Sequence, residues 1–150
     1  MMSGMRSITR VLSFALLAGA CLSQDANHPW AKSELIEPSA LAQEIKSAKP
    51  PVIIGVPFPE LFRAKHILHA IDGGPASRPA GIEQLKKAVA NLAKDSDIVV
   101  YCGCCPMETK CPNIRPAYLT LKELGFTHVR VLNIPTNMHD DWYGKDYPSE

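Results

Sequence analysis

DIVVYCGCCPMETKCPNIRPAYLTLKELG, residues 97–125, joins a strand pattern, a cysteine-rich loop and a helix pattern. Residues 97–101 form an apolar, β-branched run without polar alternation, which is typical of a strand buried on both faces. In residues 113–124 apolar side chains recur at helical spacing, and Gly125 follows as a stop signal. A strand, a loop and a helix in this order are the repeating unit of an α/β fold.

The loop carries four of the five cysteines of the chain: Cys102, Cys104, Cys105 and Cys111. Cysteine packs as a small apolar residue, but its reactivity usually decides where it is retained. Sites in open α/β sheets are commonly built at the carboxyl ends of strands, and the start of the following helix favours a thiolate. We therefore expect a thiol-based site, with Cys102 as the nucleophile.

The alternation of strand and helix patterns continues outside this stretch. Strands are predicted at 52–56, 66–71, 97–101 and 128–132, and helices at 39–48, 82–94 and 113–124. The length of 150 residues suits one domain. The sequence therefore predicts a single α/β domain with a central parallel sheet and helices on both faces.

Composition narrows the function classes. The chain is 46% hydrophobic with a net charge of +1, and its basic residues do not cluster, which argues against a nucleic-acid partner. We find no glycine-rich phosphate loop, paired carboxylate motif or Ser/His/Asp arrangement, and we predict no cofactor. The sequence leaves the oligomeric state open.

The first residues differ from the rest of the chain. Arg6 and Arg10 precede an apolar run over residues 11–20, which ends in small residues before Cys21. This order is typical of an export signal, and the run is shorter than the roughly 20 residues of a membrane-spanning helix. Cys21 after LLAGA also resembles a bacterial lipobox, whose cysteine becomes the lipidated first residue. We expect residues 1–20 to be a signal peptide.

The expected domain organisation follows from this assignment. Residues 21–34 are polar and irregular, as in a tether, and residues 35–150 hold the strand and helix patterns. The mature protein is then exported from a bacterial cytoplasm, and is periplasmic or anchored to a membrane through lipid on Cys21. Disulfides form and persist in such a compartment.

Several motifs, taken in order, resemble the rhodanese-like family from about Leu35 to Pro148. They are VIIGV (52–56), AKHILHAI (64–71), DIVVYC (97–102), KELGFTHVRVL (122–132) and W-x-x-x-x-Y-P (142–148). The loop itself is similar to that of a bacterial subgroup with the pattern C-x-C-C-P…C-P-N-x-R-P-A. The resemblance implies a parallel α/β domain in which a loop cysteine, here Cys102, carries sulfur as a persulfide. The implied partner is a small sulfur-containing anion or a protein thiol.

The loop departs from the usual family pattern. Active rhodaneses commonly carry an arginine shortly after the cysteine, but the first arginine after Cys102 in this loop is Arg115, thirteen residues on. Arg115 is our candidate for holding a sulfur oxyanion, because its guanidinium is always charged.

Three functions fit the four thiols. In the first, Cys102 carries sulfur and Cys104, Cys105 or Cys111 resolves it, in a sulfurtransferase or thiol redox enzyme. In the second, the thiolates bind a metal ion, although C-x-C-C-x₅-C lacks the paired C-x-x-C hooks of most zinc sites. In the third, disulfides staple the loop of a non-catalytic binding module. We favour the first and do not assign a metal.

We predict that the mature protein lacks residues 1–20 and carries lipid on Cys21. The wild-type protein should partition with membranes of a bacterial host, and Cys21→Ser should move it to the soluble fraction. Fractionation followed by mass analysis of the N-terminus checks both points. Recovery of a soluble cytosolic form that keeps Met1 would contradict them.

Overall fold

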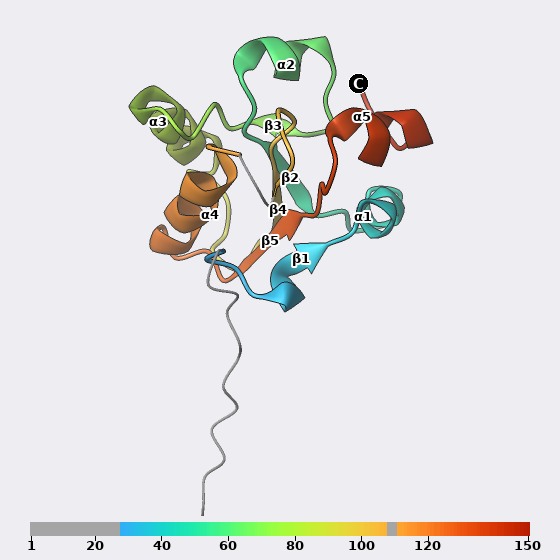
Figure 1. The fold of residues 1–150 in the computed structure, drawn as a ribbon. Helices are drawn as coiled ribbons and strands as arrows, with labels where there is room; N and C mark the ends of the chain where they lie inside the picture. Colours follow the sequence, from blue (N-terminus) through green and yellow to red (C-terminus); the bar gives the residue numbers. More distant parts are fainter. Residues whose placement is uncertain (1–27, 108–110) are drawn as a thin grey trace, which may run out of the picture.

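The computed structural model describes residues 28–107 and 111–150 and contains a five-stranded parallel sheet (Figure 1). The strand order is β1-β5-β4-β2-β3. The strands are β1 (Leu35–Ile36), β2 (Val52–Gly55), β3 (Ile71–Asp72), β4 (Asp97–Tyr101) and β5 (His128–Leu132). The α-helices are α1 (Pro38–Glu44), α2 (Pro59–Ala64), α3 (Pro79–Ala88), α4 (Ile114–Glu123) and α5 (Met138–Asp141), with short 3₁₀ helices at Lys32–Glu34 and Tyr143–Lys145. The predicted α/β class with a parallel sheet is confirmed.

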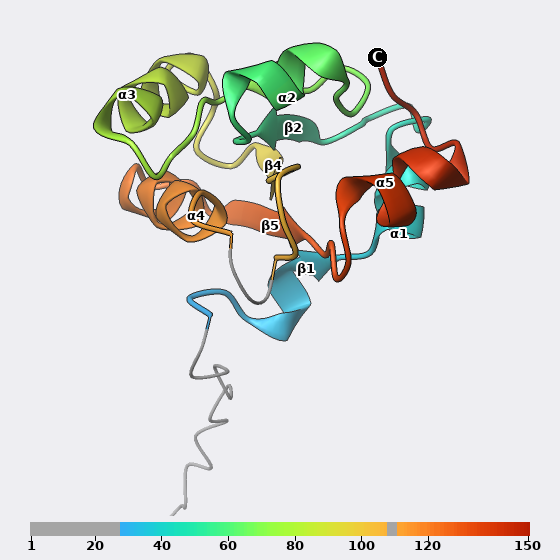
Figure 2. The same cartoon turned by 45° about the horizontal axis from the view of Figure 1, so that its top comes forward.

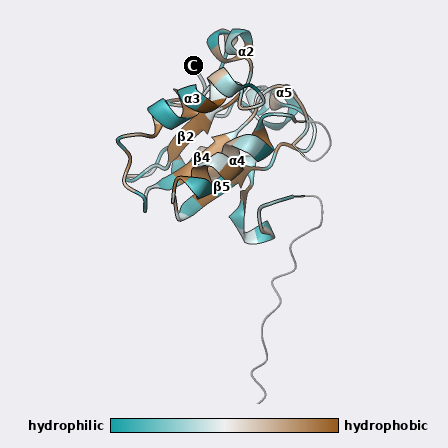
Figure 3. Ribbon diagram, turned by 90° about the vertical axis from the view of Figure 1, so that its left-hand side faces the viewer, coloured by the Kyte–Doolittle hydropathy of each residue, from teal (hydrophilic) through white to brown (hydrophobic). Residues whose placement is uncertain are grey.

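Helices cover both faces of the sheet. Figures 1 and 2 show α3 and α4 on one side and α1 and α5 on the other, with α2 beyond the carboxyl end of β2. Successive residues of a strand point to opposite faces, so Ile98 and Val100 pack toward α3 and α4, whereas Val99 and Tyr101 pack toward α1 and α5. The apolar strands are visible between the helices in Figure 3. This double burial explains why β4 lacks a polar alternation.

The predicted strand at 66–71 is wrong for most of its length. Only Ile71 and Asp72 pair with β2, and His69 has a φ of 63°, a left-handed conformation that a strand cannot contain. The backbone N–H and C=O of His66 instead bond to Glu150 at 2.8 and 2.9 Å. The segment is thus held by the end of the chain, a long-range partner that local sequence patterns do not indicate.

The N-terminal boundary of the packed domain lies before Leu35. Trp30 falls in the predicted tether (21–34), yet it is buried in the core beside α4. Its ring meets the edge of Tyr118 at a centroid distance of 5.6 Å and stacks on His28 at 4.9 Å. The signal peptide (1–20) and Cys21 lie outside the described residues. Within the described ranges, no helix has the length and apolar character needed to cross a membrane.

We predict that Trp30→Ala lowers the free energy of unfolding by about 3–5 kcal/mol, because it empties a buried aromatic site. Ser33→Ala is the control, since Ser33 is exposed in the same segment and should change stability by less than about 0.5 kcal/mol. Urea unfolding followed by circular dichroism measures both. Equal stability of the two variants would show that the segment around Trp30 does not belong to the domain.

Candidate functional site

Four thiols converge at the carboxyl end of β4. Cys102 follows the last residue of β4, and Cys111 lies three residues before the first residue of α4. The Sγ atoms of Cys102, Cys104, Cys105 and Cys111 all lie within 4.8 Å of one another. The Sγ of Cys104 is 3.0 Å from that of Cys102 and 3.0 Å from that of Cys105. We call these four residues the cysteine cluster.

The cluster is partly covered by the fold. Cys102 is 5% exposed, whereas the other three thiols are half-buried. The thiol of Cys102 points toward the carbonyl oxygen of Val56, 3.9 Å away, in the segment that follows β2. Cys102 is therefore enclosed at the end of β4, and the other three thiols are more accessible to solvent.

Two anchors hold the loop that carries the cluster. The N–H of Val56 donates to the carbonyl oxygen of Tyr101 at 2.9 Å, which continues the β2–β4 pairing up to the first cysteine. The N–H of Met107 donates to the carbonyl oxygen of Ile134 at 2.9 Å, and the Met107 side chain is buried. Met107 lies five residues after Cys102. In this chain it packs into the core.

Asn113 is the residue of the site that the sequence analysis missed. It is fully buried, and its Nδ2 donates to the Sγ of Cys102 at 3.8 Å while its Oδ1 accepts from the N–H of Ser77 at 2.9 Å. The amide therefore connects the cluster to the loop before α3. An asparagine just before a helix is a common cap, but here the side chain forms no cap hydrogen bond and is directed at the Cys102 sulfur and the Ser77 N–H.

The electrostatics of the cluster single out one thiol. Hydrogen bonds from the Cys102 and Cys104 thiols, and from the N–H groups of Asn113 and Ile114, hold the pKa of Cys111 well below its usual range. The hydrogen bond with Cys104 lowers the pKa of Cys102, but the bond that it gives to Cys111 and its burial outweigh this and raise it. The pKa of Cys104 is raised mainly because its thiol bonds to Cys102 and Cys111. These contacts favour a thiolate at Cys111, which lies just before α4.

The other predicted site residues lie as follows. Arg115 is exposed on the first turn of α4, the helix whose N-terminus contacts the cluster. Its role in holding an anion remains a prediction. Cys21, the lipidation candidate, is outside the described residues. His66, within the AKHILHAI stretch, was not a predicted site residue; it stacks on Phe62 and lies 3.5 Å from a carboxylate oxygen of Glu150. Its contacts fasten the C-terminal tail and do not reach the thiols.

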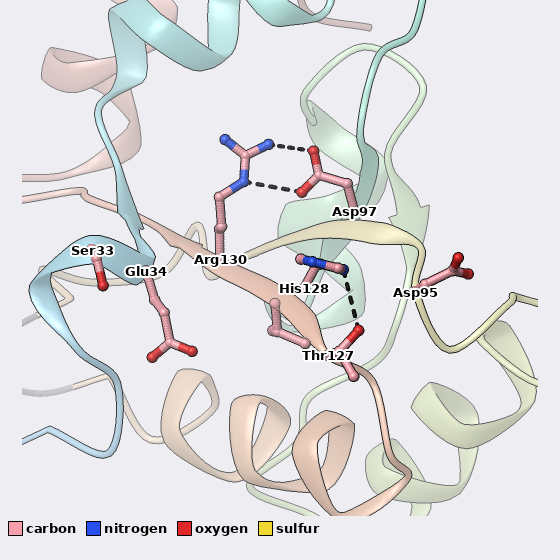
Figure 4. Close-up of a pocket in the computed structure, with 8 residues that line it drawn as sticks. Ser33, Glu34, Asp95, Asp97, Thr127, His128 and Arg130 are labelled. Atoms are coloured by element: carbon pink, nitrogen blue, oxygen red, sulfur yellow. Dashed lines mark hydrogen bonds and ion pairs between the residues drawn. The ribbon is translucent and has the colours of Figure 1, made fainter.

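An open pocket of about 520 Å³ lies at the opposite edge of the sheet, at the amino ends of β4 and β5 (Figure 4). Its walls include Asp95, Asp97, His128 and Arg130. Figure 4 shows Arg130 facing Asp97, with which it forms two hydrogen bonds of 3.0 and 2.7 Å. Arg130 also forms two hydrogen bonds with Glu44. The pairing of Arg130 with Asp97 and Glu44 links α1 to the sheet, which gives these charges a structural role.

The arrangement of the cluster allows a small set of reactions. Thiolates attack sulfur atoms, exchange with disulfides and bind soft metal ions. A thiol pair at 3.0 Å, beside a third thiol that takes up negative charge, can share protons. It can also form a disulfide by exchange with an oxidised dithiol, which accepts the two electrons.

We predict that Asn113→Ala lowers the free energy of unfolding by about 1–3 kcal/mol, because the N–H of Ser77 loses its acceptor. It should also speed alkylation of Cys102 by iodoacetamide. Ser77→Ala keeps the backbone N–H and is the control, with an effect under about 0.5 kcal/mol. Chemical unfolding and mass-resolved alkylation measure the two effects. An Asn113→Ala protein that matches Ser77→Ala in both would contradict the bridging role.

Comparison with known proteins identifies the fold. No curated protein sequence matches the chain. Among solved structures, it is similar to the rhodanese-like domain of the Alr3790 protein from Anabaena sp., determined by NMR, at 23% identity and a TM-score of 0.56, covering 78% of each chain. A crystal structure of the Anabaena protein matches at 23% identity with a TM-score of 0.59, covering 77% of this chain and 90% of that one. The family model described as "Rhodanese-like domain" matches residues 37–134, and the chain therefore belongs to the rhodanese-like domain family.

Proposed function

We propose that the protein transfers sulfur or exchanges disulfides at the cysteine cluster, with Cys102 as the persulfide carrier. One observation carries the proposal: the Sγ of Cys102 stands at the end of β4, 3.0 Å from the Sγ of Cys104 and within 4.8 Å of every other cluster sulfur. A carrier thiol and a resolving thiol are thus already in reach of each other. Membership of the rhodanese-like family supports the position of the carrier.

The first step takes sulfur from an anionic donor such as thiosulfate. The sulfur of Cys102 attacks the outer sulfur of the donor, its proton passes to the Cys111 thiolate through their hydrogen bond, and sulfite leaves with the electron pair of the broken S–S bond. The products are a Cys102 persulfide anion, a neutral Cys111 thiol and sulfite, so charge and atoms balance. Arg115 would hold the donor's oxyanion through a charge-assisted hydrogen bond.

The second step removes the sulfur by one of two routes. A protein thiol can attack the outer sulfur of the persulfide, which leaves that thiol persulfurated and returns Cys102 to its thiol form. Alternatively, Cys104 attacks the inner sulfur, forms a Cys102–Cys104 disulfide and releases hydrosulfide. A protein dithiol then reduces the disulfide by exchange and becomes oxidised itself. The distance of 3.0 Å between the two sulfur atoms supports the second route.

We further propose that this chemistry takes place outside the bacterial cytoplasm, in the periplasm or at a lipid-anchored position. The support is the charged start, the short apolar run and Cys21 in the sequence. In that compartment a disulfide within the cluster would persist until a protein dithiol reduces it.

We predict that Cys102→Ser abolishes persulfide formation and sulfite release. Arg115→Ala should weaken use of thiosulfate by about 1–3 kcal/mol, if kcat/KM is compared, because a charge-assisted hydrogen bond is lost. Sulfite release with a small thiol acceptor, and intact mass after thiosulfate treatment, measure the two effects. Cys21→Ser is the matched cysteine control and should retain full activity.

Two outcomes would overturn the proposal. Full turnover of thiosulfate by Cys102→Ser would assign the carrier to another cysteine. Four free thiols that take no sulfur from thiosulfate and form no disulfide with an oxidised dithiol would favour a non-catalytic binding module.

A further inference from the structure

We propose that the cysteine cluster also binds a single thiophilic metal ion, Zn²⁺ in the test below, through the four Sγ atoms. The inference goes beyond sulfur transfer and stands on different observations, namely the convergence of all four sulfurs and the donors arranged around them. Sulfur transfer needs only Cys102 and one neighbour. It gives no reason for four sulfurs from two ends of a loop to meet within 4.8 Å.

The spacing suits one ion. Zinc binds thiolate sulfur at about 2.3 Å in a tetrahedron, which places the four sulfurs about 3.8 Å from one another. The cluster sulfurs all lie within 4.8 Å of one another, and the two pairs that include Cys104 are at 3.0 Å. Shifts of less than about 1 Å, within the reach of side-chain torsions, produce the zinc geometry. A cluster of several irons would hold its thiolates further apart, so the spacing favours a mononuclear site.

Hydrogen-bond donors from outside the cluster are directed at two of the four sulfurs, those of Cys102 and Cys111. Nδ2 of Asn113 points at the Sγ of Cys102, and Oδ1 of the same amide is fixed by the N–H of Ser77. The N–H groups of Asn113 and Ile114 donate to the sulfur of Cys111. Outer-shell donors of this kind orient metal ligands and offset the charge of a tetrathiolate. Because Asn113 is fully buried, its amide does not bond to solvent, and its Nδ2 donates to the Cys102 sulfur.

The fold also explains why the spacing of the four cysteines in the sequence does not match that of a usual zinc site. The usual signature supplies ligands in two separated C-x-x-C hooks, whereas here three ligands lie within four residues and the fourth precedes a helix. The end of β4 and the start of α4 lie at the same edge of the sheet, and this brings Cys111 to the other three. Linear spacing cannot show that convergence.

Metal binding and sulfur transfer compete for the same atoms. Only thiolates bind the ion, so binding releases the remaining thiol protons to solvent. With all four sulfurs coordinated, Cys102 cannot attack a sulfur donor and Cys104 cannot form a disulfide. The metal-bound form is then an inactive, oxidation-resistant state of the cluster.

The test titrates the reduced, full-length protein with Co²⁺ alone under anaerobic conditions. We expect one equivalent to bind, with the strong visible absorption of tetrahedral cobalt and sulfur-to-cobalt charge-transfer bands, and Zn²⁺ to displace it. Cys111→Ser and Cys105→Ser should each weaken binding more than about 100-fold, because loss of an outer-shell partner alone typically costs 10–100-fold. Asn113→Ala should fall within that smaller range. Cys21→Ser is the matched cysteine control and should bind one equivalent as the wild type does.

Circular dichroism establishes that each variant is folded, and Cys105 is half-buried, so Cys105→Ser remains informative if Cys111→Ser unfolds. Cobalt binding no tighter than that of a variant with all four cysteines replaced by serine would overturn the metal site.

The same samples, treated with thiosulfate and analysed by intact-mass measurement, separate the two proposals. Persulfide should form on the metal-free protein and not on the zinc form. Equal persulfide in both forms would overturn the competition, and no persulfide in either would count against sulfur transfer alone.

Discussion

The hydrogen-bonded pairing of β4 with both β2 and β5 is the constraint on which the site depends. β4 is central in the sheet order and buried on both faces from Ile98 to Tyr101. Its last pair opposes Tyr101 to Gly55, and the bond from Val56 to Tyr101 extends the pairing by one more residue. Cys102 therefore has little positional freedom. The other cysteines belong to a loop, and they become a site because they are brought to this fixed sulfur.

The loop is organised by its ends and by one buried amide. Met107 ties the loop to the segment after β5, and Asn113 ties the cluster to the loop before α3. N–H groups at the N-terminus of α4 donate to the sulfur of Cys111. In a loop with one cysteine this helix end would stabilise a single anionic sulfur, whereas here the sulfur that it contacts belongs to a group of four. The rhodanese-like fold thus places four thiols together at the carboxyl end of β4.

Local sequence patterns were sufficient for the features that depend on local physics. The apolar runs of β2, β4 and β5 and the stripe of α4 identify a parallel α/β domain, and the position of Cys102 at a strand end follows from them. Features that depend on partners distant in the sequence were not predicted. The segment expected as a strand at 66–71 bonds to Glu150, and Trp30 enters the core from a polar segment. The contact of Asn113 with the Cys102 sulfur was not anticipated. The predicted helix at 82–94 instead begins at Pro79, because proline is favoured in a first turn. It ends at Ala88.

The central claim is that four thiols act as one chemical unit, and the positions of their sulfur atoms test it most directly. Anomalous scattering from sulfur in crystals of the reduced protein, grown without oxidant, locates these atoms independently of any assumed loop conformation. The account predicts the peaks of Cys102, Cys104, Cys105 and Cys111 within about the 4.8 Å that separates them here. A Cys111 sulfur well outside that distance, with Asn113 turned away from Cys102, would contradict it.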